Sequence, residues 1–530
     1  MRTRYWSRAG ARPLVLTPHR WPWPLLVTGL ALLVSALIIP PAAAVRAAGG
    51  PAAPAGRAVP AAALAVVSRT LGRDDPAYQA AIRQARLTAS DGAAGDSLGA
   101  SVSISANGNT IAAAAPDATV NGNQYEGAVY VFTKPRGGWQ DATQTAKLTA
   151  SDGTTGDSFG SFFTGDADGV AVSADGNTIV AGAPGPYGGA PGAVYVFTEP
   201  RGGWHNETQT AKLTASDAGP GDNLGATVAI SGNVIASGAP AATINGNQIQ
   251  GAVYLFTEPK GGWHDETQTA KLTASDGAAG DFLGNALAMS GRTVIAAATG
   301  ATVNGNQLEG AAYVFTEPSG GWRDETQAAK LTASDGLPYE LFGNSAAISG
   351  NVIMIGSDSP DYGGNPGLGA AYIFVRPRSG WQDATQTAEL TPSPDTPGTG
   401  LGYSVAILGP IALAGGINGV IYVFAETPGG WQNQTQLAEL TNPDDLGYME
   451  ALSRDALAAA APFATVNGNP GQGAVDVFAY GHSGARQLAA AQLTVPVLPT
   501  RPAPCLTVAR PGTPLHPTLR PVPDIHTRCQ

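Results

Sequence analysis

The segment EGAVYVFTKPRGGWQDATQTAKLTASDG at residues 126–153 returns at residues 191–218 as PGAVYVFTEPRGGWHNETQTAKLTASDA. Further copies begin at residues 250, 309 and 368, and looser ones at 418 and 472. The phenylalanine of the segment falls at 132, 197, 256, 315, 374, 424 and 478. A fixed period of this size predicts one repeat array of seven units that takes up most of the chain.

The third unit shows the internal order of a repeat most clearly. ATVAIS (226–231), VIASGAP (234–240), GAVYLF (251–256) and HDETQTAKLTAS (264–275) follow one another, and Gly, Asn and Pro residues separate them. Val, Ile, Thr, Tyr and Phe dominate these runs, and Ser-Gly-Asn is a signal for a tight hairpin. Each unit is therefore predicted to form four short antiparallel strands.

The strand AVYVF at residues 128–132 is apolar on both of its faces. A sheet of this kind has to be covered on both sides, and radial stacking of seven sheets achieves that. We therefore predict an all-β fold, a seven-bladed β-propeller of four-stranded antiparallel blades. A parallel β-helix is the alternative, but its rungs are usually much shorter than the repeat found here.

Closure of the ring requires a strand from one end of the array, because an open ring leaves two unpaired sheet edges. QARLTAS at 84–90 matches TAKLTAS and leads directly into the first unit, so the segment 82–88 is expected to complete the last blade. RQLAAAQLT at 486–494 is a competing candidate for the same position.

The units resemble FG-GAP repeats, the modules of the integrin α-subunit head and of many exported bacterial proteins. Phe-Gly stands at 159–160 and 342–343, with Leu-Gly at the matching places of other units, and Gly-Ala-Pro stands at 182–184 and 238–240. The resemblance covers about residues 80–494. It implies a seven-bladed propeller, and adhesion or ligand binding rather than catalysis. Integrin-type calcium hairpins are expected to be mostly absent, because turns such as SISANGNTI hold too few carboxylates.

Residues 1–44 have the pattern of a signal peptide, with a basic start, the apolar run LLVTGLALLVSALII at 25–39 and Ala42-x-Ala44 as a cleavage site. An uncleaved anchor is the alternative, and it would be the only membrane attachment. Residues 45–79 read as an Ala/Pro/Gly-rich linker that runs into the closing strand, 80–494 as the propeller and 495–530 as a Pro-rich tail. The tail holds Cys505 and Cys529, an even pair that can form a disulfide in an exported protein. The expected location is secreted or cell-surface.

Charge narrows the range of partners. Between residues 74 and 500 the chain has 16 basic and 39 acidic residues. An acidic surface of this kind repels phosphate backbones, so nucleic acid is excluded as a partner. We expect a monomer with an extracellular protein or glycan ligand, or a cation.

Two recurrent polar loops are predicted to meet on one face of the ring, the loop between strands 2 and 3 and the loop between blades. They can be turns whose Asp and Asn side chains bond their own backbone, or an oxygen-rich rim that binds a ligand. The rim residues are Asn121, Asn123, Asn245, Asn247, Asn304, Asn306, Asn467, Asn469, Asp91, Asp96, Asp217, Asp222, Asp276 and Asp281.

The second unit carries an insertion, SFFTGDADG at 161–169, that the other units lack. Asp166 and Asp168 before a glycine resemble the start of a calcium loop, with Asp157 as the nearest further oxygen ligand. Calcium is the one cofactor that the sequence suggests, and a solvated insertion is the alternative interpretation.

Two motifs typical of catalysis, HExxH and the P-loop, are missing from the sequence. Trp139 and its five counterparts in the GGW turns are expected to be wedges between blades rather than a sugar-binding platform, because they recur at one phase. The predicted function is thus an exported, non-catalytic binding or adhesion module. The alternatives are a hydrolase or lyase at the channel mouth, using residues such as Asp168, Glu340 and Glu450, and a purely structural surface scaffold.

Overall fold

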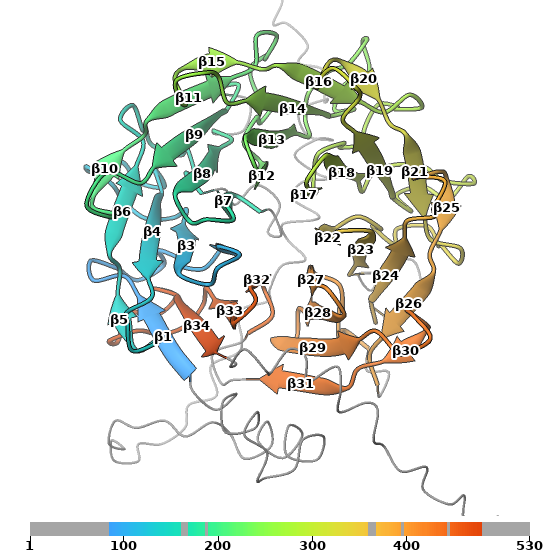
Figure 1. Ribbon diagram of the computed structural model, residues 1–530. Helices are drawn as coiled ribbons and strands as arrows, with labels where there is room; N and C mark the ends of the chain where they lie inside the picture. Colours follow the sequence, from blue (N-terminus) through green and yellow to red (C-terminus); the bar gives the residue numbers. More distant parts are fainter. Residues whose placement is uncertain are drawn as a thin grey trace, which may run out of the picture.

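The computed structural model describes residues 84–160, 168–185, 189–358, 367–393, 397–441 and 446–479. Seven sheets stand radially around a central channel (Figure 1), so the predicted propeller is confirmed. Among the described residues all regular elements are strands, and none forms a helix long and apolar enough to cross a membrane.

Each blade has four main strands, ordered from the channel outward. The innermost strands are β2 (Ser101–Ile104), β7 (Val170–Val172), β12 (Thr227–Ser231), β17 (Leu287–Ser290), β22 (Ser345–Ser349), β27 (Ser404–Leu408) and β32 (Glu450–Leu452). The second strands are β3 (Thr110–Ala115), β8 (Thr178–Ala183), β13 (Val234–Ala239), β18 (Thr293–Ala298), β23 (Val352–Ser357), β28 (Ile411–Gly416) and β33 (Ala456–Ala461).

The third strands carry the repeated phenylalanine. They are β4 (Ala128–Thr133), β9 (Ala193–Thr198), β14 (Ala252–Thr257), β19 (Ala311–Thr316), β24 (Ala370–Val375), β29 (Val420–Ala425) and β34 (Ala474–Ala479). The fourth strands are β6 (Ala146–Thr149), β11 (Ala211–Thr214), β16 (Ala270–Thr273), β21 (Ala329–Thr332), β26 (Ala388–Thr391) and β31 (Ala438–Thr441), with β1 (Gln84–Thr88) in the last blade.

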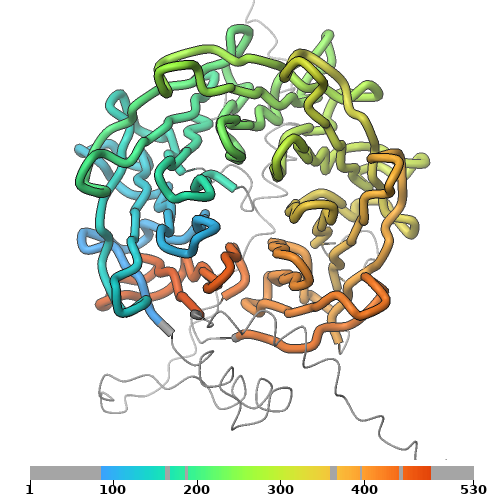
Figure 2. Tube along the Cα trace, in the orientation of Figure 1, coloured from blue at the N-terminus to red at the C-terminus, as the bar shows by residue number. Residues whose placement is uncertain are grey.

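β1 closes the ring as the sequence predicts. It pairs antiparallel with β34, with Gln84 opposite Phe478 and Leu87 opposite Val475. In Figure 2 the start of the described chain therefore lies beside its end. Residues 82 and 83 of the expected closing segment, and the competing segment 486–494, lie outside the described residues.

Within the described residues, six of the seven sheets gain a fifth strand that the sequence did not reveal. A two-residue strand from the next blade pairs in parallel with the fourth strand, and these short strands are β5 (Ala142–Thr143), β10 (Glu207–Thr208), β15 (Glu266–Thr267), β20 (Glu325–Thr326), β25 (Ala384–Thr385) and β30 (Gln434–Thr435). Side chains reinforce the pairing: the Lys212 N–H donates to Asp265 Oδ1 (2.8 Å), and the Ser216 N–H donates to Gln268 Oε1 (2.9 Å). The D/N-x-T-Q sequence after each tryptophan is therefore a clamp on the preceding blade.

The core lies between blades rather than within them. Each of the seven hydrophobic clusters in the described part of the chain combines residues of two neighbouring blades. Trp139 and Trp204 are 5% exposed and belong to such clusters, which confirms the predicted wedge. Burial of this apolar area is what holds one blade against the next.

Close backbone contacts between blades explain two of the glycines that recur in the units. A Cβ added at Gly127, before the third strand, would lie 2.4 Å from the carbonyl oxygen of Phe159 in the next blade. One added at Gly182 would lie 1.9 Å from the carbonyl oxygen of Gly225. Only glycine permits both approaches, and the φ of +86° at Gly127 favours it further.

Candidate functional site

The two recurrent polar loops meet on one face of the ring, which we call the rim face. The backbone N–H groups of Ser158 and Phe159, in the loop between blades, donate to the carbonyl oxygens of Tyr125 (2.9 Å) and Glu126 (2.8 Å). Three other blade junctions repeat these bonds, with acceptor carbonyls at residues 249–250, 308–309 and 471–472. The predicted meeting of the loops is thereby confirmed, and backbone bonds hold the loops at these four junctions.

The two asparagines of each loop have different roles. Asn123 Nδ2 donates to Glu126 Oε2 (2.8 Å) and to the carbonyl oxygen of Gly153 (3.2 Å) in the loop between blades. Its counterparts make the same pair of bonds, and they are Asn247, Asn306 and Asn469. These four amides therefore fix the junctions between blades.

The first asparagine of each loop lies on the surface. It begins an Asn-Gly turn with positive φ at both residues, as at Asn121 (51°) and Gly122 (89°). The exposed members of this set are Asn121, Asn245, Asn304 and Asn467. Asparagine is among the few residues that adopt this conformation readily. The rim face thus presents four equivalent amides on rigid turns.

In the loops before blades 1 to 4, the first aspartate forms an ion pair with the following blade. Asp91 accepts from Lys147 Nζ (2.6 Å) and from the Tyr130 hydroxyl (3.0 Å). Burial opposes ionisation, but these two groups outweigh it and hold the pKa of Asp91 below its usual value. Asp217 pairs with Lys271 and Asp276 with Lys330 in the same way.

The second aspartate of each loop caps its own turn. Asp96 Oδ2 accepts the Ala93 N–H (2.7 Å), and Asp222 and Asp281 accept from residues three positions earlier. Burial raises the pKa of all three carboxyls despite these bonds. The aspartates of the predicted rim are therefore engaged within the fold, and their role in ligand binding stays a prediction.

The residues of the suggested calcium site take separate positions. Asp157 accepts from the Thr154 N–H (2.6 Å) and hydroxyl (2.9 Å), Asp168 lies in the channel, and Asp166 is outside the described residues. In the described ranges no group of three or more His, Cys, Asp or Glu side chains is placed to hold a metal. Cys505 and Cys529 also lie outside these ranges, so the calcium site and the disulfide both stay predictions.

The central channel has a cavity of about 220 Å³, lined by the innermost strands of all seven blades. Its walls are mostly Val, Ala, Leu and Ile, with two carboxylates, Asp168 before β7 and Glu450 at the start of β32. Both lie where innermost strands begin, which is the rim-face mouth, because each of these strands follows a loop between blades. Burial raises the pKa of Asp168 to about 7. Burial and the charge of Asp168 raise the pKa of Glu450 to about 8, against the lowering effect of the Ser404 hydroxyl and the Gly415 N–H.

Glu340, the other acid considered for a channel-mouth site, is used in the fold. Its Oε1 accepts from the Tyr372 hydroxyl (2.6 Å) and its Oε2 from the Leu337 N–H (2.7 Å). In blades 1 to 4 an aspartate accepts the hydrogen bond from the tyrosine equivalent to Tyr372, as Asp91 does from Tyr130, and in blade 5 Glu340 replaces that aspartate. Glu340 is therefore a junction residue rather than a free acid.

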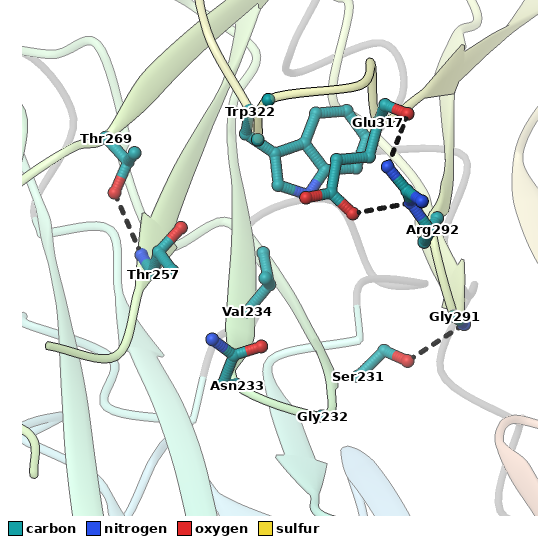
Figure 3. Close-up of a pocket in the computed structure, with 12 residues that line it drawn as sticks. Ser231, Gly232, Asn233, Val234, Thr257, Thr269, Gly291, Arg292, Glu317 and Trp322 are labelled. Carbon is teal, nitrogen blue, oxygen red and sulfur yellow. Dashed lines mark hydrogen bonds and ion pairs between the residues drawn. The ribbon is translucent and has the colours of Figure 1, made fainter. Parts of the chain in front are cut away.

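A second cavity of about 380 Å³ opens between blades 3 and 4, on the face opposite the rim (Figure 3). We call this the hairpin face, because the GGW turns lie on it. Arg292 Nε donates to Glu317 Oε2 (2.9 Å), and Trp322, 7% exposed, stands beside this pair. The other blades hold no arginine at the place of Arg292. The charges of Arg292 and Glu317 neutralise each other, and Trp322 is buried in the hydrophobic cluster between blades 3 and 4. We therefore interpret the pair as a structural contact between the hairpin turn at residue 292 and the GGW turn of the same blade.

The comparison with protein families agrees with this architecture. The family described as "FG-GAP repeat" matches residues 82–132, 142–197, 208–256, 267–315 and 326–374. A search of curated proteins gives no significant match. Among solved structures, the computationally designed Ika8 protein is similar at 12% identity and a TM-score of 0.39, over 74% of this chain and 98% of its own.

Proposed function

Because the chain is an FG-GAP repeat protein, we propose that it is an exported, non-catalytic binding or adhesion module whose rim face contacts an extracellular protein or glycan. FG-GAP propellers are commonly binding modules and generally lack catalysis. A fold alone does not assign a function, so the proposal rests on the rim itself.

The observation that carries the proposal is that the two asparagines in each loop between strands 2 and 3 have different roles. One asparagine, such as Asn123, clamps the loop, while its neighbour Asn121 stays exposed on a turn of fixed shape. A rigid loop loses little conformational entropy on binding. Four equivalent exposed amides provide several weak contacts, whose combined avidity exceeds that of any single one.

The proposal includes export through residues 1–44 and a place on the cell surface or in the medium. FG-GAP repeats occur in extracellular or surface proteins, which supports it. Fractionation of cells that express the full chain with a C-terminal tag, followed by N-terminal sequencing, tests this part. A mature chain in the medium or cell wall that begins just after Ala44 is expected, and a full-length chain in the cytoplasm would contradict export.

Binding is tested with the full chain on arrays of glycans and of purified extracellular matrix proteins. The decisive variant is Asn121→Gly/Asn245→Gly/Asn304→Gly/Asn467→Gly, since glycine keeps the positive φ and removes only the amide. We expect specific retention by the wild type, a small loss for a single substitution and a nearly complete loss for the quadruple variant.

A matched control removes exposed charges from the opposite face. Arg136, Arg201 and Lys260 lie on the GGW turns and are exposed, so their triple alanine variant should bind like the wild type. Equal retention of the wild type and the quadruple variant would contradict the rim as the binding surface. Turnover of a retained glycan would contradict the proposed non-catalytic function and would indicate an enzyme.

A further inference from the structure

The two carboxylates at the channel mouth depart from the pattern of the repeat. The position of Glu450 on the innermost strand is apolar in the other six blades, as at Val102 and Val228. The position of Asp168 is Ala in blades 1 and 3 and an uncharged Asn or Tyr in blades 4 to 7, so only blade 2 places an acid there. An acid in a channel of apolar side chains costs free energy unless something pairs with it. These substitutions therefore need a reason other than the packing of the blades.

Glu450 has an acceptor that the described protein leaves unused. The residue is 6% exposed; its Oε2 accepts from the Ser404 hydroxyl, whereas its Oε1 is buried and has no hydrogen-bond partner. A buried polar atom without a partner is uncommon and destabilising. It marks a place where a donor from outside the chain can bind.

The lining of the channel selects the chemistry of that donor. Lys, Arg and His are absent from the described residues that line it, so the two acids have no internal counter-ion there. Calcium needs six to eight oxygen ligands, and the described residues provide no cluster of three acidic or metal-binding side chains. An alkylammonium group needs only three acceptors, which the carboxylates of Asp168 and Glu450 and a water molecule can supply.

The walls suit the rest of such a ligand. Val102, Val228, Leu287 and Val405 offer apolar surface against which methylene groups can pack. The cavity of about 220 Å³ has the volume of roughly seven water molecules in the liquid, enough for a linear chain of six to eight non-hydrogen atoms.

We propose that the rim-face mouth of the central channel binds a linear alkylamine, with its ammonium group between Asp168 and Glu450 and its methylene chain along the apolar wall. The site is separate from the rim amides, so it does not depend on the function proposed above. A free diamine and the lysine side chain of a partner share this chemistry.

Protonation of the two acids is linked to binding. Without a ligand, burial favours their neutral forms near pH 7, and a bound ammonium favours the ionised forms. No other titratable side chain lines the channel among the described residues. Affinity should therefore rise from pH 6 to pH 9, and binding at pH 6.5 should release protons to the buffer.

Calorimetry of the full chain with 1,4-diaminobutane, in two buffers of different ionisation enthalpy, tests the proposal. The variants are Glu450→Val and Asp168→Ala, which introduce residues that other blades already hold at these positions, so both should fold. Each should weaken binding at least tenfold, as expected for loss of a charged hydrogen bond. Glu317→Gln on the hairpin face, and the quadruple asparagine variant of the rim, should bind the diamine like the wild type.

Three results would overturn the proposal: no binding by the wild type at pH 9 with 10 mM diamine, undiminished binding by both channel variants, or loss of binding in the quadruple rim variant. A peptide with one internal lysine, compared with its norleucine counterpart, then identifies the source. Tighter binding of the lysine peptide than of the diamine indicates a partner side chain, and weaker binding indicates a free amine.

Discussion

Replacement of Arg86 by alanine should open the ring at its closing strand. In the last blade Asp476 stands where the third strands of blades 1 to 6 hold a tyrosine, and it is fully buried. Arg86 Nε and Nη2, from β1, donate to its two carboxylate oxygens at 2.9 and 2.7 Å. This two-pronged pair fixes the N-terminal strand to the C-terminal end of the described ring.

The magnitude follows from the burial of the carboxylate that remains. Removal of one partner of a buried ion pair leaves an uncompensated charge and costs about 3–5 kcal/mol. Lys212→Ala is the matched control, because Lys212 holds the same place in blade 2 but its partner Asp152 is 47% exposed. That pair should contribute about 0–1 kcal/mol, as exposed pairs do. The Arg86→Met/Asp476→Leu variant removes both charges and should lie close to the wild type.

Guanidinium unfolding of the four full-length proteins provides the measurement, with hydrogen exchange of residues 84–88 as a local readout. Arg86→Ala should lower the midpoint more than Lys212→Ala and should deprotect β1 before the rest of the ring. An equal or smaller effect of Arg86→Ala, with β1 still protected, would refute the reasoning about closure.

Three further predictions concern the seams and the channel. Gly251→Ala should destabilise the fold by at least about 2 kcal/mol more than Gly246→Ala. Of these two glycines, only Gly251 would bring an added Cβ against the next blade, 2.3 Å from the Leu283 carbonyl oxygen. Equal midpoints of unfolding for the two variants would contradict this close approach. Gln268→Ala removes one clamp and should cost about 1 kcal/mol in the same assay, whereas no change would show that water replaces it. Glu450 has a raised pKa of about 8, so the stability that its proton contributes is complete below pH 4.5 and is lost as the pH rises through 8. Between pH 5 and pH 8 the free energy of unfolding should therefore fall by up to about 1.4 kcal/mol per pH unit relative to Glu450→Val. Parallel pH curves for the two proteins would contradict this.

Much of the fold could be predicted from the sequence because recurring residues mark where each repeat unit begins and ends. The spacing of Phe132 and its counterparts fixes the number of blades, and the two apolar faces of AVYVF require neighbours on both sides. The match of QARLTAS to TAKLTAS identifies β1 as the closing strand. These inferences depend only on local pattern and on the need to pair strand edges.

The site could be predicted only in outline. Asn121 and Asn123 are the same residue type two positions apart, and only the register between loops shows that Asn123 faces the junction while Asn121 faces solvent. The Asp91–Lys147 pair joins residues 56 positions apart, so no local pattern indicates it. Alignment of the units with one another places Glu450 at a position where several other units have valine. This difference is the sequence signal that could have identified the channel as a candidate site.

Hydrogen exchange of the full chain with a ligand retained on the arrays tests most directly the claim that the rim is the binding surface. Protection on binding is expected in all four Asn-Gly loops, at residues 118–124, 242–248, 301–307 and 464–470, with no change in the GGW turns. Protection confined to the GGW turns, or to one blade alone, would contradict it.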